Sequence, residues 1–120
     1  MKMLNNIKDA LKSTDFHVEP SMKVLDLSKK FKSKFGLSLR VYKGRQIISD
    51  GRVTLNSLDE RTTKTSIKFN ADKMVIKANM EVGFVEKMFK TQLGIIVQIA
   101  DAENINLVPN NLTLGNAKRK

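Results

Sequence analysis

The 120-residue sequence contains no cysteine and no tryptophan, and it has only one histidine and two prolines. Without cysteine, a disulfide framework, a thiolate metal site and a cysteine nucleophile are all excluded. The single histidine is His17, and no motif places a carboxylate or a nucleophile beside it. We therefore predict that the protein is not an enzyme and that it holds no cofactor and no metal ion.

Longer functional motifs are missing as well. The sequence has no Gly-x-Ser-x-Gly elbow and no glycine-rich run that ends in Gly-Lys-Ser/Thr. Its most apolar uncharged stretch is residues 91–100, about half of the roughly 20 residues that a membrane-spanning helix needs. Polar residues, among them Lys8 and Asp9, occupy the place of the apolar part of an export signal. These absences predict a cytoplasmic protein that does not enter a membrane.

The sequence resembles itself at a shift of 58 residues. Residues 14–43 align with residues 72–101, and six of the 30 aligned positions are identical. At a shift of 59, residues 53–55 align with residues 112–114. The matches fall at core-type periodicity, so we interpret the chain as an internal duplication. The identical pairs are Met22/Met80, Val24/Val82, Lys29/Lys87, Phe31/Phe89, Lys32/Lys90 and Gly36/Gly94.

Each copy has the pattern of a strand, a helix and a second strand. Alternating apolar residues predict the strands, and apolar residues spaced by three and four predict the helices. Gly36 and Gly94 stand where a helix ends in the left-handed conformation. The first copy is predicted to have strands at residues 16–18 and 37–42 around a helix at residues 23–35; the second, strands at residues 74–76 and 95–99 around a helix at residues 81–93.

The predicted fold class is α+β, with two repeated β-α-β(-β) units whose helices pack on one face of a mixed sheet. Residues 1–58 form the first repeat, which begins with a short helix at residues 3–12, and residues 59–65 form a charged linker. Residues 66–117 form the second repeat, which begins with a hairpin, and residues 118–120 form a basic tail.

The first copy resembles the ubiquitin-like β-grasp family. Residues 16–21 are similar to the second strand of that family and the approach to its helix, and the helix before Gly36 has the family's length. Residues 39–47, Asp50-Gly51 and Thr54-Leu55 resemble its strand, Gly-Lys turn, Asp-Gly and Thr-Leu run; residues 67–76 and 112–114 would be the corresponding hairpin and Thr-Leu run of the second copy. The resemblance implies a tandem β-grasp fold and adaptor-like binding. It does not imply conjugation to targets, because the sequence ends without a diglycine.

A second architecture fits the same pattern. The strand–helix–strand units at residues 16–43 and 74–101 would interleave into one ferredoxin-like sheet with both helices on one face. One shared core suits 120 residues better than two small cores, which are marginal. The two architectures differ in whether residues 39–41 and 97–99 lie in one sheet or in two.

Positive charge is concentrated in one part of the chain. The sequence has 22 Lys and Arg against 12 Asp and Glu, a formal charge of +10. Residues 29–52 carry +7 of this charge and the last three residues carry +3. We predict a binding surface in the first repeat that consists of Lys29, Lys30, Lys32, Lys34, Arg40, Tyr42, Lys43, Arg45 and Arg52.

Two kinds of partner fit this surface. An acidic protein would be attracted by its field, and this adaptor hypothesis agrees with the ubiquitin-like resemblance. Alternatively, the same cations would contact a nucleic-acid backbone while Tyr42 stacks on a base. The sequence does not predict the oligomeric state.

Overall fold

The computed structural model describes residues 16–58 and 74–118. The helix predicted at residues 3–12, the linker at residues 59–65 and the first strand of the hairpin lie outside the described residues, as does the end of the basic tail. The elements are β1 (Phe16–His17), α2 (Val24–Phe35), β2 (Ser38–Lys43), β3 (Gln46–Ile47), the 3-10 helix η1 (Leu55–Leu58), β4 (Val75–Ile76), α3 (Val82–Met88), the π-helical turn η4 (Phe89–Leu93), β5 (Ile96–Ala100) and α4 (Leu114–Lys118).

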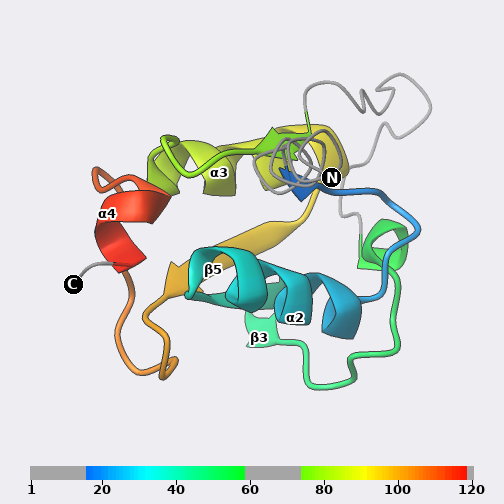
Figure 1. Cartoon of the computed structure of the whole chain (residues 1–120). Coiled ribbons are helices and arrows are strands. Elements are labelled where there is room, and N and C mark those ends of the chain that lie inside the picture. Colours follow the sequence, from blue (N-terminus) through cyan, green and yellow to red (C-terminus); the bar gives the residue numbers. More distant parts are fainter. Residues whose placement is uncertain (1–15, 59–73, 119–120) are drawn as a thin grey trace, which may run out of the picture.

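Strands from the two halves of the chain pair with each other in two small antiparallel sheets (Figure 1). β1 pairs with β4, so that Phe16 lies opposite Ile76. The larger sheet has the order β3-β2-β5, and in it Leu39 lies opposite Ile99. The predicted α+β class is confirmed.

The strand arrangement differs from both architectures expected from the sequence. β2 and β5 come from different halves and share one sheet, so the halves do not form separate sheets as in a tandem arrangement. β1 and β4 form a ribbon apart from that sheet, so the strands do not make a single ferredoxin-like sheet. Every strand pairing among the described residues is antiparallel, which corrects the expected mixed sheet. This pairing covers an edge of each half with a strand of the other and merges two small cores into one.

The two pairings between the halves share one feature: each contains a residue that lies opposite the residue 58 positions later in the sequence. His17 lies opposite Val75 in the ribbon, and Arg40 lies opposite Gln98 in the larger sheet. In both pairs the two residues are 58 positions apart, which is the shift that aligns the two halves of the sequence. The strand pairings therefore have the same spacing in sequence as the similarity between the two halves.

The loops of the two halves are held by corresponding main-chain hydrogen bonds. In each half, the chain that follows the sheet returns to the start of the helix and pairs with it. All these bonds measure 2.8–3.0 Å. In the first half they run from Val24 N–H to Val53 O, from Leu25 N–H to Gly51 O and from Leu55 N–H to Met22 O. The corresponding bonds of the second half run from Val82 N–H to Leu112 O, from Gly83 N–H to Asn110 O and from Leu114 N–H to Met80 O. These partners agree with the shift of 58 near the helices and 59 in the returning loops.

Both main helices end at a glycine with left-handed backbone, as predicted. Gly36 follows α2 with φ of 69°, and Gly94 follows η4 with the same φ. The apolar positions at spacings of three and four are the buried face of α2. In the second half, the predicted helix is present but its last turn is π-helical. The local pattern therefore located each helix and its end.

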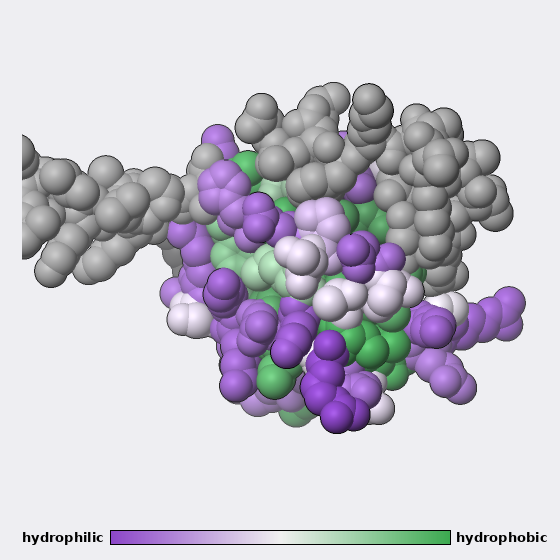
Figure 2. Space-filling view, turned by 90° about the vertical axis from the view of Figure 1, so that its right-hand side faces the viewer, coloured by the Kyte–Doolittle hydropathy of each residue, from purple (hydrophilic) through white to green (hydrophobic). Residues whose placement is uncertain are grey.

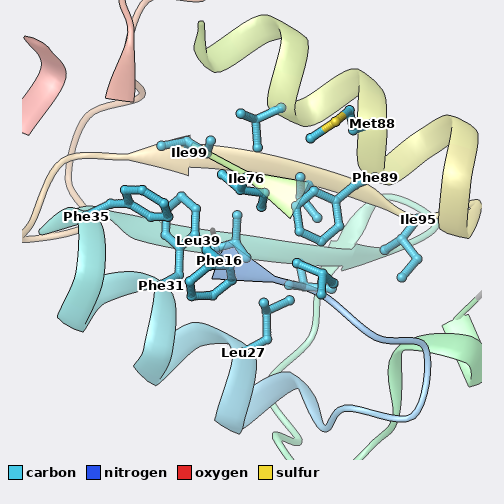
Figure 3. Close-up of a cluster of buried hydrophobic side chains, with 14 of the residues drawn as sticks. Phe16, Leu27, Phe31, Phe35, Leu39, Ile76, Met88, Phe89, Ile95 and Ile99 are labelled. Atoms are coloured by element: carbon cyan, nitrogen blue, oxygen red, sulfur yellow. The ribbon is translucent and has the colours of Figure 1, made fainter. Parts of the chain in front are cut away.

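The described residues share one apolar core (Figure 3). Figures 1 and 3 show α2 on one side of the core and α3 on the other, with β5 between them. Phe31 packs against Phe16 and Phe35 with ring centroids 6.0 Å and 5.0 Å apart, respectively. Among the described residues no polar or charged side chain is buried. Of the helices within these ranges, none has the length and apolar character to cross a bilayer.

Candidate binding surface

The outer face of the larger sheet carries apolar side chains that are open to solvent. Because side chains alternate along a strand, the burial of Leu39 and Val41 places Tyr42 on the outer face. Tyr42 lies opposite Ile47 on β3 and opposite Ile96 on β5. Ile47 is 52% exposed and Ile96 is 43% exposed. We call Ile47, Tyr42 and Ile96 the outer-face row.

Hydrogen bonds hold two polar side chains of this face in place. The Tyr42 hydroxyl donates to Gln98 Oε1 at 2.6 Å. Arg40 Nε donates to Asn104 Oδ1 at 2.6 Å, and its Nη2 donates to the Asn104 carbonyl at 3.1 Å. The guanidinium of Arg40 is therefore bound to the loop that follows β5.

The predicted lysines lie on the solvent side and the flanks of α2. Lys29, Lys30, Lys32 and Lys34 are all exposed. Lys32 Nζ donates to the Ala102 carbonyl at 2.7 Å, so that it contacts the same loop as Arg40. The helix and the outer face are thus linked through this loop.

The remaining predicted cations lie in two places. Lys43 and Arg45 are exposed at the turn between β2 and β3, at one end of the strand that carries Tyr42. Arg52 instead forms an ion pair with Asp50, with Nε and Oδ1 3.0 Å apart. Hydrogen bonds from the Arg52 side chain and backbone lower the pKa of Asp50. The structure places Arg40 and Tyr42 on the outer face of β2, with Arg40 bound to the loop after β5, and Lys43 and Arg45 at the turn between β2 and β3. It binds Arg52 to a carboxylate in a separate loop.

A groove of about 350 Å³ lies between β5 and the helix α3–η4. It is lined by Gly83, Glu86, Lys87, Lys90, Ile96, Val97 and Gln98. Glu86 Oε2 accepts a hydrogen bond from the Ile99 N–H at 3.1 Å. Burial raises the pKa of Glu86, and the bond from Ile99 opposes this rise. The groove was not predicted from the sequence, because it depends on which strand lies beside α3.

The raised pKa of Glu86 predicts a pH dependence of stability. The unfolded chain releases this proton at lower pH than the folded chain, so the contribution of Glu86 is present at low pH and is lost as the pH rises through the folded pKa. As the pH rises from about 4 to about 7, we expect the free energy of unfolding to fall less for Glu86→Gln than for the wild type. Urea unfolding across this range measures the difference, which should be small beside that of a core substitution. Parallel stability profiles for the two proteins would contradict it.

A second groove, of about 450 Å³, lies between the end of α2, the loop after β5 and α4. Asp101 lines this groove, but its carboxylate accepts hydrogen bonds from the Ile105 N–H at 2.8 Å and the Asn106 N–H at 3.2 Å. These bonds lower the pKa of Asp101. Within residues 16–58 and 74–118, no group of three Asp, Glu or His side chains is arranged to hold a metal ion.

Figure 2 shows, on one side of the molecule, hydrophobic areas at the surface between hydrophilic side chains. No protein-family model, no curated protein and no solved structure matches the chain. The surface chemistry therefore supplies the argument for function.

Proposed function

We propose that this chain is a non-enzymatic binding protein, an adaptor that recognises an acidic protein partner through the outer face of its larger sheet. The observation that carries the proposal is the outer-face row, which spans three strands and has an exposed isoleucine at each end, with the exposed cations Lys43 and Arg45 at the nearby turn between β2 and β3. An apolar centre with a charged rim is typical of a protein–protein interface. A nucleic-acid backbone is contacted mainly through cations and needs no apolar centre.

The pairing of the cations indicates which of them a partner would contact. Lys32 and Arg40 already donate to groups of the loop after β5, and Arg52 is paired with Asp50. Contact of any anionic group with these three cations would compete with those bonds. The hairpin cations Lys43 and Arg45 are exposed, and they lie where they would steer an acidic surface toward the outer-face row.

We also propose that the two halves are copies of one unit, of the ubiquitin-like type that the sequence resembles. Their most specific common feature is a close contact between the helix and the returning loop. A Cβ atom on Gly51 would lie 2.7 Å from Leu25 Cβ, and one on Gly83 would lie 3.0 Å from Asn110 Cβ. In the first half the glycine is Gly51 of the loop, which faces Leu25 of the helix. In the second half it is Gly83 of the helix, which faces Asn110 of the loop. A contact that is kept while the small residue changes sides supports descent from one unit.

A capture experiment with matched variants tests the proposed function. The full chain is immobilised and exposed to nuclease-treated lysate, and the captured protein is then titrated against each variant. We expect Ile47→Ser/Arg45→Glu to weaken binding about tenfold or more, about 1.4 kcal/mol, because it removes an apolar contact and reverses a rim charge. Phe84→Ser, which changes an exposed apolar residue of α3, should bind like the wild type.

Two outcomes would overturn the proposed function. One is the absence of any protein whose capture depends on Ile47 and Arg45. The other is retention of nucleic acid alone, in an amount that falls with salt and with nuclease treatment, which would support the nucleic-acid alternative.

A further inference from the structure

The outer-face row crosses the larger sheet at a right angle to its strands. Tyr42 lies directly opposite Ile47 on one side and directly opposite Ile96 on the other. Neighbouring strands are about 4.8 Å apart, so three residues in such a row span about 10 Å. The Tyr42 hydroxyl donates to Gln98 Oε1 at 2.6 Å, which holds the tyrosine side chain toward β5. The row therefore offers three contact points on a rigid sheet, at intervals of about 5 Å.

These intervals match the repeat of an α-helix. Along one face of a helix, positions i, i+4 and i+7 are separated by about 6 Å and about 4.5 Å, and together they span about 10.5 Å. An extended chain presents the same face at every second residue, so its first three positions span about 13 Å. A helix that lies across the strands can therefore place one apolar side chain over each member of the outer-face row, whereas the spacing of an extended chain does not match it.

The surroundings of the row favour a negatively charged partner. The three strands of the larger sheet contain no Asp or Glu. Near the β3 end of the row, Lys43 and Arg45 are exposed at the turn. At the β5 end, Ile96 lines the groove of about 350 Å³ together with Lys87 and Lys90, which are also exposed. The row thus has cations near both of its ends, on different elements of the fold.

The groove beside α3 extends the row beyond β5. Gly83 lines the groove and brings no side chain into it. The only carboxylate among its lining residues is that of Glu86, which accepts a hydrogen bond from the Ile99 N–H at 3.1 Å. The groove therefore has room at Gly83, and its exposed charges are the two lysines. An acidic side chain that follows the apolar contacts of the row would meet these lysines first.

We propose that the acidic partner presents an amphipathic helix, which lies across the strands of the larger sheet with its apolar side chains on the outer-face row. The inference rests on the proposed function and defines the binding element of the partner. One end of the helix lies near Lys43 and Arg45, and the acidic side chains of the other end contact Lys87 and Lys90 in the groove. Apolar anchors at i, i+4 and i+7 are the usual way in which an amphipathic helix binds an apolar surface.

A designed peptide tests the recognition of a helix. It has about 16 alanine and glutamate residues and blocked ends, with three leucines at i, i+4 and i+7 and glutamates toward both ends. The peptide is titrated into the isotope-labelled full chain and followed by NMR. We expect the largest shifts at Ile47, Tyr42 and Ile96. Two control peptides should bind at least about tenfold more weakly: one has its leucines at alternate positions, and the other has a proline between the leucines, which breaks the helix.

Two double variants test the part of the groove. Lys87→Gln/Lys90→Gln should weaken binding of the helical peptide, and of a captured partner, about fivefold or more. Lys29→Gln/Lys30→Gln removes the same charge from α2 and should stay within about twofold of the wild type. The control is suitable because α2 and Leu39 of β2 bury their side chains in one core, which places α2 on the opposite side of the sheet from the row. Circular dichroism should show the wild-type fold for both variants.

The results separate this inference from the proposed function. No binding of the helical peptide, equal binding of the proline peptide, or shifts centred away from the outer-face row would overturn the inference, even where a captured protein depends on Ile47 and Arg45. A captured partner that binds Lys87→Gln/Lys90→Gln as well as the wild type would also overturn it. Binding of the helical peptide at the row without any captured protein would support recognition of a helix and overturn the proposed function.

Discussion

Replacing Phe31 by alanine is expected to lower the free energy of unfolding by about 3–5 kcal/mol. Phe31 is fully buried in the core that the two halves share. Its loss would leave a cavity and also remove the ring contacts with Phe16 and Phe35, which add about 0.5–1.5 kcal/mol to the burial of aromatic side chains. Urea or guanidinium unfolding of the wild type and the variant measures the change.

Two other phenylalanines serve as controls for this result. Phe89 is the equivalent residue of the second half and is equally buried, but no ring among the described residues packs against it. We expect Phe89→Ala to fall near the lower end of the same range. Phe84 is 51% exposed, so Phe84→Ala should change stability by only about 0.5 kcal/mol. A loss of less than about 1 kcal/mol in Phe31→Ala would contradict a core shared by both halves.

Gly51→Ala is expected to destabilise the protein by about 1–3 kcal/mol through overpacking. The added Cβ would lie 2.7 Å from Leu25 Cβ and 3.3 Å from Leu25 Cα. One of these atoms belongs to the helix backbone, so the clash cannot be relieved by a side-chain rotation alone. Leu25→Gly removes the clash, and by itself it costs about 1 kcal/mol as a glycine within a helix.

A double-mutant cycle isolates this contact. The double variant Leu25→Gly/Gly51→Ala should be more stable than the sum of the single changes by about 1 kcal/mol or more. Gly115→Ala is the control, because a Cβ there would meet its nearest neighbour, the Ala78 carbonyl oxygen, at an ordinary 3.4 Å. If the effects of the two single changes on the free energy of unfolding were additive, the side chains at positions 25 and 51 would not restrict each other's size. That result would remove the main support for a common ancestral unit.

Local sequence patterns were sufficient for the main helices and strands. Apolar spacing located α2 and the helix α3–η4, and the glycines after them have the left-handed backbone expected. The short helices η1 and α4 were not predicted. Each is too short to be stable alone, and each begins where a main-chain bond ties Leu55 or Leu114 to the loop before the neighbouring helix. Tertiary contacts therefore determine these two helices.

The candidate surface could be predicted only in part. The basic residues can be recognised in the sequence as a local excess of positive charge. Tyr42 can be recognised because it alternates with apolar residues along a predicted strand. Ile47 and Ile96 were missed, because they become one row only when β3 and β5 pair on either side of β2. The bonds from Lys32 and Arg40 to residues 102–104 join parts of the chain that are more than 60 positions apart, and no local pattern indicates them.

The chain thus shows where local and long-range information divide. Composition, periodicity and glycine positions are local properties, and they were enough for the α+β class, the main helices and the concentration of charge in residues 29–52. Strand pairing is not local, because the main-chain groups of a strand can form hydrogen bonds with strands of either half. The pairing that forms depends on which arrangement buries the apolar faces of both halves. That choice put β2 beside β5 and left the outer face of the larger sheet exposed to solvent. The proposed binding surface follows from it.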